Sequence, residues 1–176
     1  MNREVDAPNI ATSDNQKSSV GSDRSLRLQI IAIAVLALVQ TIRIFAFQLA
    51  QDVFAGSASI EWLYPAYLDM FVGITAPFVA FAIWRRTGLA VWTTAIVWFT
   101  ISILDHLDAV TVILNVTGPL PSSFPAGSPS SAVMFLLVSV ALEGLALVSL
   151  TRAKMRTHYL GSLRAAEKGT QDRRSS

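Results

Sequence analysis

The chain contains no cysteine and only two histidines, and few of its 176 residues carry a charge. The absence of cysteine excludes disulfides, thiolate metal sites and cysteine nucleophiles, and it leaves the redox compartment of the protein undetermined. Charged residues make up 15% of the chain, whereas hydrophobic residues make up 52%. An ordinary soluble domain of this length has a larger charged fraction, so the composition predicts an integral membrane protein.

The sequence also lacks the motifs of the common enzyme classes. No serine and histidine stand at the spacing of a catalytic triad, and neither a zinc-protease helix signature nor a glycine-rich phosphate loop occurs. A haem held by two histidines is excluded, because His106 lies in an apolar segment and His158 lies in the basic C-terminal tail. The sequence therefore predicts no catalytic residue, no cofactor and no metal ligand set, and it leans against an enzyme without excluding one.

Long apolar segments are what the chain does have. Four of them have about the length that an α-helix needs to cross a bilayer, roughly 20 residues, at about 28–50, 63–84, 89–109 and 132–150. We therefore predict an all-α integral membrane protein in which residues 26–151 form an antiparallel four-helix transmembrane bundle. Residues 1–25 are polar and without apolar periodicity, which predicts a disordered N-terminal tail, and residues 152–176 form a basic C-terminal tail.

Basic residues are distributed unevenly along the chain. Of the 14 lysines and arginines, four precede the first span, two lie between the second and third, and seven follow the fourth. The positive-inside rule then predicts that both termini are cytoplasmic. The expected location of the protein is the plasma membrane, which is the inner membrane if the source is a bacterium. The lipid bilayer is the expected partner, and the same rule explains the basic tail without nucleic-acid binding. A cleaved signal peptide is the competing interpretation of the N-terminus, but the first apolar run begins late and is long for such a peptide.

Ionisable residues interrupt the spans and form a candidate site. A charged residue at the centre of a spanning helix costs roughly 2.5 to 3.5 kcal/mol on insertion scales, so such residues normally face protein or water. Counting residues from the cytoplasmic side places Arg43, Asp69 and Asp105 at about 24 to 25 Å and Glu143 at about 13 Å. The predicted intramembrane polar cluster consists of Arg43, Asp69, Asp105, Asp108 and Glu143. A secondary set of nearby residues consists of Gln40, Trp98, Ser102, His106 and Ser139.

The cluster contains more acids than bases. We expect Arg43 to pair with Asp69 or Asp105, which leaves three of the four acids without a basic partner in the spans. A buried carboxyl group either takes up a proton or binds a cation. The predicted function is therefore an outward-facing polar cleft that binds or conducts a proton, a cation or a small cationic solute.

A half-channel is the sharpest form of this hypothesis. In it Glu143 is protonated at the deep end, Asp108 lies at the mouth, and Gln40 and Ser139 supply intermediate hydrogen bonds. The alternative is a non-catalytic membrane subunit or assembly partner, as a homo- or hetero-oligomer, in which the cluster only holds helices together by hydrogen bonds worth about 0.6 kcal/mol each. A metal bound by His106 and neighbouring acids is a further alternative, although adjacent side chains diverge by about 100° on a helix.

Small residues follow one side of the second span. Asp69, Gly73, Ala76 and Ala80 recur at intervals of three or four residues, so they share one face of a helix. Small side chains at such spacing allow two helix backbones to approach closely in a membrane. We therefore expect another helix to pack tightly against this face.

Overall fold

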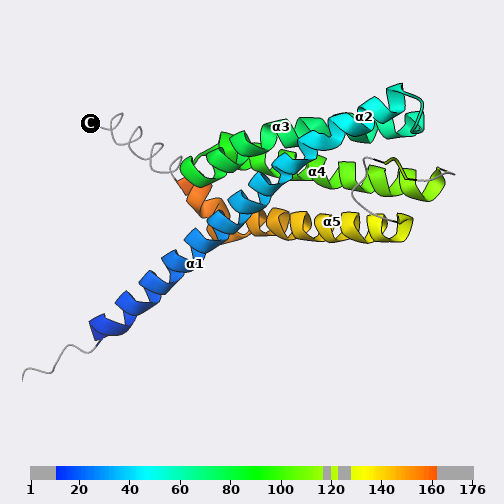
Figure 1. Ribbon diagram of the computed structural model, residues 1–176. Helices are drawn as coiled ribbons and strands as arrows, with labels where there is room; N and C mark the ends of the chain where they lie inside the picture. The colour runs from blue at the N-terminus through cyan, green and yellow to red at the C-terminus, as the bar shows by residue number, and fades with distance from the viewer. Residues whose placement is uncertain (1–10, 117–119, 123–127, 162–176) are drawn as a thin grey trace, which may run out of the picture.

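The computed structural model describes residues 11–116, 120–122 and 128–161 (Figure 1). All regular structure in this part of the chain is helical, which confirms the predicted all-α class for it, and no strand occurs there. The elements in chain order are α1 (Ala11–Val39), the 3-10 helix η1 (Gln40–Ala46), α2 (Phe47–Phe54), the 3-10 helix η2 (Ile60–Trp62), α3 (Leu63–Arg85), α4 (Leu89–Asn115) and α5 (Pro129–Thr151).

Four helical segments are long and apolar enough to cross a membrane: Asp23–Phe54, Ile60–Arg85, Leu89–Asn115 and Pro129–Thr151. The first of them joins α1, η1 and α2 without interruption. These segments coincide with the four predicted spans and extend beyond most of their ends. Figure 1 shows α3, α4 and α5 lying along one another, while α1 crosses them obliquely and its N-terminal end projects away.

Helix α1 begins at Ala11, inside the stretch for which the sequence predicts a disordered tail. Residues 11–27 contain no proline. Each residue added to an existing helix needs only its own hydrogen bond, so the helix of the apolar span can extend toward the N-terminus. Residues 1–10 of the predicted tail lie outside the described residues. The polar composition therefore does not mark the beginning of the helix.

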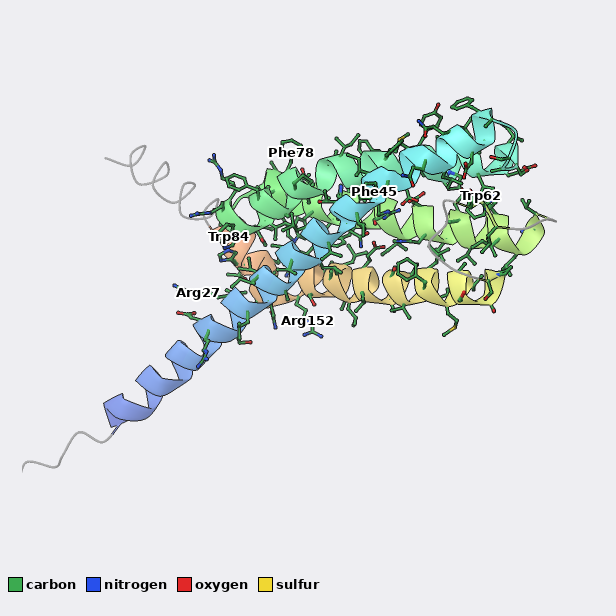
Figure 2. The ribbon with its side chains drawn as sticks, viewed as in Figure 1. Arg27, Phe45, Trp62, Phe78, Trp84 and Arg152 are labelled. Atoms are coloured by element: carbon green, nitrogen blue, oxygen red, sulfur yellow. The ribbon has the colours of Figure 1, made fainter. Side chains whose placement is uncertain are left out.

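Two apolar cores fill the bundle and lie at different levels along it. One gathers residues from α1, α3, α4 and α5 and includes Ile33, Val72 and Phe99. The other lies toward the opposite end and includes Leu49 and Trp62. Figure 2 shows Trp62 toward one end of the bundle and Arg27, Trp84 and Arg152 toward the other. In the first, third and fourth segments, buried polar residues stand between the members of these two cores, and in the second segment the half-buried Asp69 has that position.

The expected close approach at the small-residue face of α3 is confirmed. Ala76 and Ala80 are buried there. A methyl group added at Gly73 would stand only 2.4 Å from the backbone nitrogen of Ile44 in η1. No side chain larger than hydrogen fits between the two backbones, so Gly73 fixes the distance between η1 and α3.

The beginning of the predicted C-terminal tail is part of the packed structure. Residues 153–161 are helical, and Met155 and Tyr159 are fully buried. The hydroxyl group of Tyr159 donates a hydrogen bond to the carbonyl oxygen of Ile83 (2.9 Å), and the backbone nitrogen of Gly88 donates to the carbonyl oxygen of Tyr159 (2.9 Å). Burial raises the pKa of Tyr159 to about 12, so the phenol is a neutral donor at physiological pH. The remaining tail residues, 162–176, lie outside the described residues.

Candidate functional site

Arg43 is the centre of a buried polar network. Its guanidinium group donates hydrogen bonds to Asp69 on α3 and to Ser102 and Asp105 on α4. A third carboxyl group is close, because Nη1 of Arg43 lies 3.8 Å from Oε1 of Glu143 on α5. The side chain of Arg43 is only 7% exposed. The expected ion pair of Arg43 is confirmed, and it involves both of the proposed partners rather than one.

Glu143 joins the network from α5 and is fully buried. Its Oε1 accepts hydrogen bonds from the amide nitrogen of Gln40 (2.9 Å) and from the hydroxyl group of Ser102 (2.6 Å). Its Oε2 lies 3.1 Å from Nδ1 of His106. We call the connected residues the polar layer, because they separate the two apolar cores. The polar layer consists of Gln40, Arg43, Asp69, Ser102, Asp105, His106 and Glu143.

The 3-10 geometry of η1 explains why two of its side chains reach the same place. A 3-10 helix has about three residues per turn, so side chains at positions i and i+3 are eclipsed. Gln40 and Arg43 have this spacing, and both are buried toward the bundle. On an α-helix the same pair would diverge by about 60°. Side chains three residues apart share a face in either helix type, and the 3-10 geometry aligns Gln40 and Arg43 more closely.

The structure places Glu143 beside Gln40 and Ser102, both of which donate hydrogen bonds to it. The indole nitrogen of Trp92 donates to the carbonyl oxygen of Leu150 (3.0 Å), which joins α4 to α5 below this contact. Counting predicts that Glu143 lies about 11 Å nearer to the cytoplasmic side than Arg43. The two side chains nevertheless meet, because Nη1 of Arg43 lies 3.8 Å from Oε1 of Glu143.

Three of the predicted site residues lie outside the polar layer. Asp108 is half-buried one turn beyond Asp105 on α4. The indole nitrogen of Trp98 donates to the hydroxyl group of Thr75 (2.8 Å), which joins α4 to α3. The hydroxyl group of Ser139 donates to the carbonyl oxygen of Phe135 in its own helix (3.1 Å). These contacts do not make Ser139 a step between Asp108 and Glu143.

The remaining predicted residues come together from four elements. Gln40, Ser102 and His106, which the sequence places in the secondary set, are direct partners of Glu143. Asp105 and His106 serve different partners, as their divergence on the helix predicts. Sequence reasoning does not single out Thr41, whose hydroxyl oxygen is buried without a hydrogen-bond partner. The available signal for Thr41 in the sequence was its position next to Gln40.

The polar layer contains an excess of negative charge. With His106 neutral, one guanidinium group faces the three carboxyl groups of Asp69, Asp105 and Glu143, so full ionisation gives a formal charge of −2. Oδ1 of Asp105 is buried and has no hydrogen-bond partner. Uncompensated charge in a low-dielectric interior is costly, and binding a proton or another cation reduces it.

Side chains in the polar layer touch one another directly, which leaves little room for a large solute. Among the described residues, no group of three or more histidine and acidic side chains has an arrangement that could hold a metal ion. A cavity that the structure does contain lies elsewhere, between α1 and α3, and its walls are apolar. This cavity is therefore not the polar cleft that the sequence predicts between Asp105 and Glu143.

In the described part of the chain, the fold is all-helical, with four segments of transmembrane character and a buried network of charged side chains between them. Comparison of the chain with protein families, with curated proteins and with solved structures finds no match.

Proposed function

We propose that this is a multi-pass protein of the plasma membrane whose polar layer binds and releases a proton. The observation that carries the proposal is the presence of three carboxyl groups around the single guanidinium group of Arg43, together with the unpartnered, buried Oδ1 of Asp105. A proton is the cation that suits this layer, because it needs neither a cavity nor a set of metal ligands. Acid and histidine side chains inside spans commonly serve proton relays.

The surface supports the membrane assignment. Large apolar side chains are exposed along the spans, including Phe78 at 72% and Leu114 at 70%. Figure 2 shows Phe78 on the outside of α3. Side chains of this kind are stable against lipid tails and unfavourable in water. The lipid bilayer is therefore the proposed partner, and the proposal needs no second protein chain.

The proposed topology is an antiparallel bundle with both termini on the cytoplasmic side. Its support is the positive-inside rule, since basic residues precede the first span and follow the second and fourth. A reporter that is active only outside the cytoplasm is expected to be inactive when fused after Ser176 and active when fused within 55–59. An active reporter after Ser176 contradicts the proposed orientation.

Replacement of Glu143 by glutamine tests proton binding. Infrared difference spectra of the reconstituted wild-type protein are expected to contain a protonated-carboxyl band that disappears as the pH rises between about 5 and 9, a range that buried carboxyl groups reach. Glu143→Gln preserves the size of the side chain but removes one titratable group of the layer, so it is expected to abolish the band or move its midpoint by about one pH unit or more. Glu61→Gln is the matched control, because Glu61 is exposed and outside the polar layer.

Two results contradict the proton-binding proposal. One is a wild-type spectrum without a pH-dependent carboxyl band in this range. The other is a folded Glu143→Gln variant whose band and midpoint equal those of the wild type.

A structural role is the second candidate, and the connectivity of the layer favours it. Arg43 links η1 to α3 and α4, and Glu143 links α5 to η1 and α4. In this case the protein is a non-catalytic membrane subunit in which the layer fixes the helices to one another. Glutamine can retain the hydrogen bonds of Glu143, so a structural role predicts a folded variant with unchanged function and no titrating carboxyl group.

A further inference from the structure

An apolar groove of about 440 Å³ lies between α1 and α3. It is distinct from the polar layer, because none of its lining residues belongs to that layer. The volume is within the range of small-molecule sites, about 300 to 1,000 Å³. The groove is lined from α1 by Ile31, Ala34, Val35 and Leu38, and from α3 by Pro77, Ala80, Phe81 and Trp84.

Arginines stand at one end of this groove. Arg24 and Arg27 precede Ile31 by two turns and one turn of α1, so all three share a face of the helix. On α3, Arg85 follows Trp84, and its guanidinium carbon lies 4.4 Å from the centre of the Trp84 ring. These three arginines are exposed. Figure 2 shows Arg27 and Trp84 toward the same end of the bundle.

The charge at this end is predominantly positive. Residues 23–31 and 77–88 contain four arginines, the fourth being Arg86, and one acid, the exposed Asp23. Arginine recognises phosphate through paired N–H donors, and basic sites next to spanning helices bind anionic lipid head groups. The tryptophan at the end of the groove has the position typical of the membrane–water interface. An apolar slot that leads to arginines matches a molecule with a long hydrocarbon chain and an anionic head.

We propose that the groove binds one acyl chain of an anionic phospholipid, with the phosphate group on Arg27 and Arg85. This site is independent of the polar layer and of proton binding. A second copy of the chain is a poorer occupant, because an apolar helix in the groove would leave the arginines without an anionic partner.

Lipid retention by the purified full-length protein tests the proposal. The protein is offered equal amounts of phosphatidylglycerol and phosphatidylcholine in detergent, and bound lipid is counted by native mass spectrometry. We expect one retained phosphatidylglycerol per chain and little phosphatidylcholine. The double variant Arg27→Gln/Arg85→Gln is expected to weaken this retention by about thirtyfold, because each basic residue near an anionic membrane lipid contributes about one kcal/mol.

Matched variants separate the groove from general basicity. Arg152→Gln/Arg156→Gln removes two exposed arginines outside the groove and is expected to retain phosphatidylglycerol as the wild type does. Val35→Trp fills the groove from its exposed side and is expected to reduce retention of the lipid while leaving all arginines in place. Equal retention of the two lipids, or equal loss in both arginine double variants, overturns the proposal. A dimeric protein in which position 35 is protected from chemical labelling also overturns the proposal, because a second copy of the chain then occupies the groove.

Discussion

Arg43→Ala is expected to yield little folded protein. The substitution leaves Asp69 and Asp105 without their cationic partner and removes a donor from Ser102. Removing one partner of a buried ion pair costs about 3 to 5 kcal/mol, which is a large fraction of the stability of a small domain. The yield of monodisperse protein after extraction, and its thermal unfolding followed by circular dichroism, measure the effect.

Neutralising the acids at the same time is expected to restore part of the loss. In Arg43→Ala/Asp69→Asn/Asp105→Asn no charge remains uncompensated at these three positions, so the triple variant should be more stable than Arg43→Ala alone. Arg43→Lys retains the charge but loses the forked donor geometry that reaches both acids, so its stability should be intermediate. Equal yields for Arg43→Ala and the triple variant would refute the pairing as a determinant of stability.

Gly73→Ala is the second substitution with a large expected effect. The added methyl group would stand 2.4 Å from the backbone nitrogen of Ile44 and 2.9 Å from the carbonyl carbon of Arg43. Backbone atoms cannot rotate away as a side chain can, so η1 must move from α3 and carry Arg43 with it. Overpacking of this kind costs about 1 to 3 kcal/mol, and we expect the upper end of that range.

The same substitution at Gly144 is the control. No heavy atom outside its own helix neighbourhood lies within 4 Å of a methyl group placed there. Alanine has a higher helix propensity than glycine, so Gly144→Ala should be neutral or stabilise α5 by up to about 1 kcal/mol. Thermal unfolding in one detergent compares the two variants. Equal effects at the two positions would contradict the close contact between η1 and α3.

The sequence predicts the helical class and the four apolar segments because both depend on local composition and length. It also predicts that Arg43 pairs with an acid, since a buried charge needs a partner and the spans contain few acidic residues. The close approach at Gly73 follows from spacing alone. Each of these features depends either on residues that are close together in the chain or on a small number of charges.

The remaining features depend on how segments are placed relative to one another. The contacts of Glu143 with Gln40 and Ser102 could not be counted from Arg152, because they depend on how α5 is placed along η1 and α4. The 3-10 geometry of η1 has no periodic signature in an apolar run, although it aligns Gln40 and Arg43 more closely than an α-helix does. Ser139 is predicted as a site residue from its place in the sequence, which does not show that its hydroxyl group bonds its own helix.

Arg43 belongs to the first spanning segment, and its two carboxylate partners belong to the second and third. If the segments insert in chain order, the segment that carries the guanidinium group therefore enters the membrane before the segments that carry Asp69 and Asp105. Its insertion cost of roughly 2.5 to 3.5 kcal/mol must be offset by the surrounding apolar residues alone. The first segment is also more apolar than the second and third, as this order of events requires. In that order, the second and third segments bring their acids to the arginine of the first.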